Sequence, residues 1–164
     1  MKLYSKLFGI PKYNYTLAED YSYKLKYIKA VNFNVDFGSI SMWTSNTSVN
    51  YVLRIKNQYA WDGCSGYVWQ GETIERKDWM PIVTPNSDRY TNTLAASLIH
   101  DFLYQYINEI AKAMGISKSK ARKLIDKEFY EILKVCEFSL ALVYYYGVRL
   151  LGRYTNSYMN WVHA

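Results

Sequence analysis

Hydrophobic and polar residues alternate with a period of two over residues 21–55. This repeat is expected when successive side chains point to opposite faces of a sheet. Gly38-Ser39 and Ser45-Asn46-Thr47-Ser48 interrupt the alternation with residue types that favour turns. The pattern therefore predicts a small antiparallel sheet in the amino-terminal part of the chain. The apolar positions of its expected strands are Tyr21, Tyr23, Leu25, Tyr27, Val31, Phe33, Val35, Phe37, Val49, Tyr51, Leu53 and Ile55.

The period changes to that of helices after residue 92. Apolar residues recur at helical spacing from Leu94 to Ile110, and Gly115 supplies a helix stop. Ser117 is the expected N-cap of a second helix, whose apolar stripe ends at Cys136. Because the connection around Gly115 is short, the two helices are expected to form an antiparallel hairpin. A third helix, over about residues 139–151, is expected to pack on them.

Residues 57–92 show neither period and are expected to form a long loop. A loop of that length inside a compact domain is usually functional or disordered. Its three tryptophans, Trp61, Trp69 and Trp79, favour an ordered loop. The sequence thus predicts one α+β domain over residues 1–164, built from an amino-terminal antiparallel sheet, a long ordered loop and a carboxy-terminal helical hairpin with a third helix.

Composition narrows the function classes. The net charge is +6 and the pI is about 9.1, but no run of five like charges occurs, so we do not expect nucleic-acid binding. Cys64 and Cys136 are the two cysteines, which excludes the disulfide framework of a small secreted protein. The apolar run at the amino terminus is too short for a secretory signal, and the eleven-residue run at 138–148 is too short to cross a membrane. We expect a soluble protein.

A histidine and a carboxylate on neighbouring helices form the candidate site. His100 lies at the edge of the first helix's apolar stripe, and Tyr104 follows one turn later on the same side. An imidazole at such a border is partly desolvated yet reachable by a ligand, which suits a general base. Asp126 takes the corresponding border on the second helix, where antiparallel packing brings its carboxylate towards the ring. A simple hairpin centred on Gly115 leaves the pair roughly 6 Å out of step, which an early end of the first helix would correct.

The same residues also allow other interpretations. Asp126 is placed to form an ion pair with Arg122 one turn earlier, while His100 and Tyr104 have an ordinary structural role. Cys64, His100 and Asp126 also contain the parts of a cysteine nucleophile, its base and an orienting carboxylate. Zinc is disfavoured because His163 is the only histidine besides His100.

Four motifs resemble a widespread phage and prophage domain family of unknown function. They are WDGCSG at 61–66, AASLIHDFLY at 95–104, SKARKLIDKEFYEIL at 119–133 and YYYGVRLLG at 144–152. They match that family's D-G-x-S loop, H-D-x-L-Y helix, D-x-x-F helix and closing Y-x-x-V-R-x-x-G helix, over about residues 61–152. The resemblance implies a bacteriophage protein found in the virion or the host cytoplasm.

A more distant resemblance implies a chemistry. HDFLY at 100–104 and RKLIDKEF at 122–129 are similar to prokaryotic phospholipase A2, in which an H-D-F-x-Y helix faces a helix reading R-I-D-x-x-F. The resemblance implies that His100 is the base that activates water and that Asp126 orients the His100 ring. Tyr104, one turn after His100, is a further candidate catalytic residue. It also implies Asp101 as a calcium ligand, with Asp62 and the carbonyl oxygens of residues 62–66 completing the shell.

Two function classes follow from these resemblances. The first is a phage-encoded, calcium-dependent hydrolase that acts on ester bonds of envelope lipids, with membrane lipid as its partner. The second is a non-catalytic virion component, such as a tail or connector protein, whose partners are other virion proteins and in which the same motifs join the loop to the helices. Likeness of fold or motif alone does not establish activity.

Overall fold

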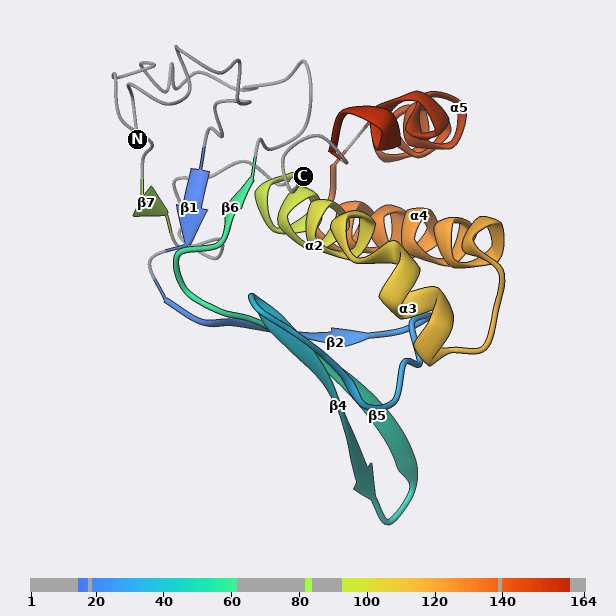
Figure 1. The fold of residues 1–164 in the computed structure, drawn as a ribbon. Helices are drawn as coiled ribbons and strands as arrows, with labels where there is room; N and C mark the ends of the chain where they lie inside the picture. Colours follow the sequence, from blue (N-terminus) through green and yellow to red (C-terminus); the bar gives the residue numbers. More distant parts are fainter. Residues whose placement is uncertain (1–14, 18, 62–81, 84–92, 139, 160–164) are drawn as a thin grey trace.

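The computed structural model describes residues 15–17, 19–61, 82–83, 93–138 and 140–159. Strands occupy the amino-terminal part of the described chain, and four helices follow them (Figure 1). The predicted α+β fold class is confirmed.

The main sheet has four antiparallel strands in the order β2-β5-β4-β3. The strands are β2 (Tyr21–Leu25), β3 (Phe33–Val35), β4 (Gly38–Ser45) and β5 (Ser48–Ile55). The turn expected around residues 45–48 joins β4 to β5, with Ser45 paired to Ser48. The expectation that Gly38-Ser39 ends the alternation was wrong, because these residues begin β4. Val31 and Phe37, apolar positions of the expected strands, lie outside the strands and are exposed. Val49 lies next to the β4–β5 turn and is also exposed, and this hairpin extends beyond the helices that cover the sheet (Figure 1).

A second, smaller sheet was not predicted. It has the order β6-β1-β7, in which β1 (Tyr15–Leu17) runs antiparallel to β6 (Ala60–Trp61) and parallel to β7 (Ile82–Val83). Strands of two or three residues are too short to produce a detectable period. The expected long loop lies mostly outside the described residues, apart from these two strands and the segment before β6.

The first predicted helix is two helices in the structure. The bounds are α2 (Leu94–Gln105), α3 (Ile107–Ala113), α4 (Lys118–Val135) and α5 (Ala141–Met159). Tyr106, with φ −105° and ψ 27°, separates α2 from α3, which turns away from the α2 axis (Figure 1). The expected helix stop and N-cap are confirmed: Gly115 has φ +61°, and Ser117 Oγ accepts a hydrogen bond from the Lys120 amide at 3.2 Å. Within the described ranges no helix is both long and apolar enough to cross a membrane.

Helices α2 and α4 lie between the main sheet and α5 (Figure 1). At the sheet, Phe102 of α2 packs directly on Gly38, where a Cβ atom would lie 2.7 Å from Phe102 Cζ and would also overlap the Arg54 carbonyl oxygen. Glu128 of α4 is fully buried and accepts hydrogen bonds from the backbone N–H groups after β2, at 2.9 Å from Lys26 and 2.8 Å from Tyr27. These contacts fix α2 and α4 on the sheet and therefore fix the residues between the helices.

Candidate functional site

His100 and Asp126 meet between α2 and α4. The distance from His100 Nε2 to Asp126 Oδ1 is 3.3 Å. The mismatch expected of a simple hairpin is absent because α2 ends at Gln105 and α3 takes a different direction. The break at Tyr106 thereby lets the imidazole and the carboxylate lie level with each other across the two helices.

Asp126 is the centre of the cluster and is completely buried. Tyr104 donates its hydroxyl to Oδ1 at 2.5 Å, and Arg149 of α5 donates Nη1 to Oδ2 at 2.7 Å. The alternative ion pair with Arg122 is not formed; the carboxylate pairs with Arg149 instead. Burial would raise the pKa of Asp126, but hydrogen bonds from His100, Tyr104 and Arg149 outweigh burial and hold the pKa below its ordinary value. Asp126 is therefore an anion with a fixed orientation.

The His100 ring is held on both sides by aromatic side chains. Its centroid lies 4.3 Å from that of Tyr104 and 4.7 Å from that of Phe129, and 11% of its side chain is exposed. The second ring nitrogen, Nδ1, lies 3.6 Å from Asp101 Oδ1. Burial alone would lower the pKa of His100, but the carboxylates of Asp101 and Asp126 raise it above its ordinary value.

This geometry assigns different tasks to the two ring nitrogens. Because each ring nitrogen lies beside a carboxylate, the neutral His100 ring donates either through Nε2 to Asp126 or through Nδ1 to Asp101, and the first tautomer leaves the lone pair on Nδ1. A base whose far nitrogen is bound to a buried carboxylate keeps its tautomer, and its cation is stabilised once a proton is taken up. The arrangement can therefore remove a proton from a water molecule or hydroxyl group placed at Nδ1.

The expected metal ligands are only partly described. Asp101 lies beside His100, whereas Asp62, the remaining carbonyls of residues 62–66 and the alternative nucleophile Cys64 lie outside the described residues. In the described part of the chain, no three histidine, cysteine, aspartate or glutamate side chains are placed to hold a metal ion. Calcium takes six to eight oxygen ligands, so the described residues alone do not form a calcium site.

Arg149 belongs to the cluster but was not predicted as a site residue. Its signal in the sequence is a single cation directly after the eleven-residue apolar run at 138–148. A charge at the edge of an apolar helix face generally needs a partner on a neighbouring element. Asp126 is that partner, and 25% of the Arg149 side chain remains exposed.

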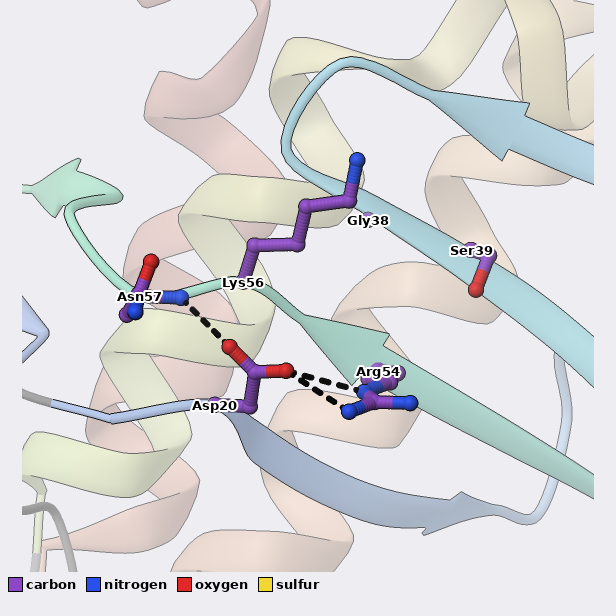
Figure 2. A pocket seen from close by; sticks show the side chains of 6 residues that line it. All are labelled: Asp20, Gly38, Ser39, Arg54, Lys56 and Asn57. Carbon is purple, nitrogen blue, oxygen red and sulfur yellow. Dashed lines mark hydrogen bonds and ion pairs between the residues drawn. The ribbon is translucent and has the colours of Figure 1, made fainter.

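A hollow of about 320 Å³ lies at one end of the main sheet, where β4 begins and β5 ends, and is lined by none of the expected catalytic residues (Figure 2). Asp20 accepts hydrogen bonds there from the Asn57 amide at 2.9 Å and from Arg54 Nη2 at 2.8 Å. Lys56 donates Nζ to the Asp36 carbonyl oxygen at 2.8 Å. Because its charges are engaged with one another or with the backbone, this hollow is a weaker candidate than the His100 cluster.

Comparison of the chain with protein-family models, with curated proteins and with solved structures found no match.

Proposed function

We propose that the protein is a phage-encoded hydrolase in which His100 activates water and Asp126 orients the imidazole. The observation that carries this proposal is the 3.3 Å contact between His100 Nε2 and a fully buried Asp126. Tyr104 and Arg149 hold both oxygens of that carboxylate in place, so the ring can rotate little during proton transfer. The hydroxide equivalent formed at Nδ1 would attack the carbonyl carbon of an ester, and the imidazolium would return its proton to the leaving alcohol.

Exposed apolar side chains on α5 support lipid esters as the substrate class. Leu142, Val143, Tyr146 and Leu150 are each more than half exposed and fall on one side of the helix. Arg149, which binds Asp126, lies at the edge of this stripe by helical geometry. An apolar helix face beside the site suits an enzyme that works at a lipid surface.

Calcium is part of the proposal through Asp101 and Asp62. Asp101 is 22% exposed at its side chain and lies 3.6 Å from the nitrogen that would face water. A bound calcium ion would supply polarisation of the ester carbonyl. Its remaining ligands would come from residues outside the described part of the chain, so the proposal assigns no catalytic step to the ion.

The competing proposal is a structural virion component, and the low exposure of His100 favours it. With 11% of the side chain accessible, the ring is as well covered as a residue that only holds two helices together. In that case the hydrogen bonds of Asp126 only hold α2, α4 and α5 together, and the protein does not hydrolyse esters.

Incubation of purified protein with mixed phospholipid vesicles separates the two proposals. We expect release of fatty acid with calcium, little release with chelator, and a loss of about a hundredfold or more in His100→Gln. His163→Gln makes the same chemical change at the other histidine and serves as the control, with circular dichroism to confirm folding. No release under either condition, or equal rates in wild type and His100→Gln, would reject the hydrolase.

A further inference from the structure

Arg122 is a cation near the candidate site, and one of its guanidinium nitrogens is buried and unpaired within the described part of the chain. Its Nε atom is buried and has no hydrogen-bond partner among the described residues. The nearest carboxylate along the same face of α4, that of Asp126, is bound by His100, Tyr104 and Arg149. A buried donor of this kind is uncommon in folded proteins and needs an explanation.

The position of Arg122 follows from the packing of the two helices. Arg122 precedes Asp126 by one turn, roughly 6 Å along α4. Because α2 runs antiparallel to α4 and His100 lies opposite Asp126, Arg122 lies opposite the next turn of α2, which carries Tyr104. Burial and Asp126 raise the pKa of Tyr104, whereas the charges of Arg122 and Arg149 oppose the rise, which agrees with Arg122 lying close to the phenol.

The chemistry of the side chain indicates what it would bind. A guanidinium group presents several N–H donors in one plane, and this fork matches the oxygens of a phosphate group. Arg122 as a whole residue is only partly buried, although its Nε atom is buried. Arg122 lies one helical turn from Asp126, the residue that contacts His100, so an anion bound by its guanidinium group would lie near the imidazole.

We propose that Arg122 binds the phosphate group of a phospholipid and thereby places the ester beside His100. This proposal rests on the hydrolase function for its second half only. Binding of a phosphate group by Arg122 can be measured whether or not the protein is an enzyme.

Binding is tested by titrating inorganic phosphate, and separately glycerophosphocholine, into ¹⁵N-labelled protein and following the arginine Nε–H resonances by NMR. We expect a saturable shift of the Arg122 resonance. Arg122→Gln removes the arginine resonance, so binding to that variant is followed through the backbone amide resonances of α4. These should not shift when ligand is added to Arg122→Gln. Lys123→Gln removes the same charge from the exposed neighbouring position and should retain the shifts.

Each outcome of the titration decides a point. A response to both ligands, or to glycerophosphocholine alone, supports the site, and the second result identifies a headgroup rather than free phosphate as the ligand. No saturable response to either ligand, or an equal loss in Lys123→Gln, overturns the proposal.

Kinetics then separate this proposal from the hydrolase. In an active protein, Arg122→Gln should raise the KM for phospholipid about tenfold, the effect of one lost charge-assisted hydrogen bond. The control variant Lys123→Gln should leave the KM for phospholipid near the wild-type value. Saturable phosphate binding without hydrolysis of any ester would reject the hydrolase and support the phosphate site. Hydrolysis with the same KM in Arg122→Gln and wild type would support the hydrolase and reject the phosphate site.

Discussion

Replacing Asp126 by asparagine tests the geometry of the cluster most directly. The substitution keeps the size of the side chain and removes its charge. The oxygen of the new asparagine side chain can still accept a hydrogen bond from the Tyr104 hydroxyl. The amide nitrogen of the new side chain is itself a donor and then faces another donor, either Arg149 or His100. The variant therefore loses the anion and at least one of the three hydrogen bonds.

The cost follows from burial. Removing one partner from a buried ion pair generally costs about 3–5 kcal/mol of folding free energy, because the other charge remains uncompensated. Asp126 is completely buried, but 25% of Arg149 is exposed and water recovers part of the loss. We expect Asp126→Asn to lower the free energy of unfolding by about 3 kcal/mol at mildly acidic pH.

The difference in free energy of unfolding between wild type and Asp126→Asn should become smaller at both low and high pH. The folded-state pKa of Asp126 is lowered, so its contribution is present above the unfolded value of about 3.9 and is lost as pH falls through the folded value. The folded-state pKa of His100 is raised, so its contribution is complete below the unfolded value of about 6.5 and is lost as pH rises through the folded value. The gap between wild type and variant should be widest between about pH 4 and pH 6.5.

Urea unfolding followed by tryptophan fluorescence at about pH 3, 5 and 9 measures this gap. Asp20→Asn is the matched control, because Asp20 also accepts from an arginine and a backbone amide but lies at the surface, and its loss should be small. A gap below about 1 kcal/mol at pH 5 would show that Asp126 is not the buried centre of a charged cluster. An unchanged gap at pH 9 would show that its partner is not a histidine.

Two further substitutions test how the helices are fixed on the sheet. Glu128→Ala leaves the backbone donors of Lys26 and Tyr27 without an acceptor and should cost roughly 3 kcal/mol in urea unfolding, whereas alanine at the nearby surface residue Glu131 should have little effect. Gly38→Ala places a methyl group against Phe102 and neighbouring backbone, and should lower the free energy of unfolding by roughly 1–3 kcal/mol in the same urea experiment. An unchanged free energy of unfolding would mean that α2 does not contact β4.

Residue patterns predicted the elements whose period extends over several turns or strand positions. The alternation around Tyr23 and Leu53 and the helical stripe ending at Cys136 correspond to β2, β5 and α4. The break at Tyr106 was missed because the apolar spacing continues through it, so that α2 and α3 have the sequence of one helix. Strand β1 was missed because its partners, β6 and β7, come from distant and non-periodic segments.

Of the candidate site, the sequence predicted only the residues whose proximity follows from spacing along one helix or from the packing of two consecutive helices. His100 and Tyr104 follow from a one-turn spacing, and Asp126 follows from the expected hairpin. Arg149 could not be placed, because the orientation of a third helix depends on packing that no local period describes. The same limit made Arg122 the expected partner of Asp126, since it was the cation closest in sequence.

The polar character of this cluster bears on the choice between the two proposed functions. A buried ion pair contributes little net stability, and well-packed apolar side chains of similar volume often stabilise a fold as much or more. A residue needed only to join three helices could therefore be apolar at position 126. The anion is required if the imidazole beside it must take up a proton, because the carboxylate stabilises the resulting cation. Asp126→Asn should accordingly reduce hydrolysis under conditions where the variant is still fully folded, and a fully active folded variant would favour the structural role.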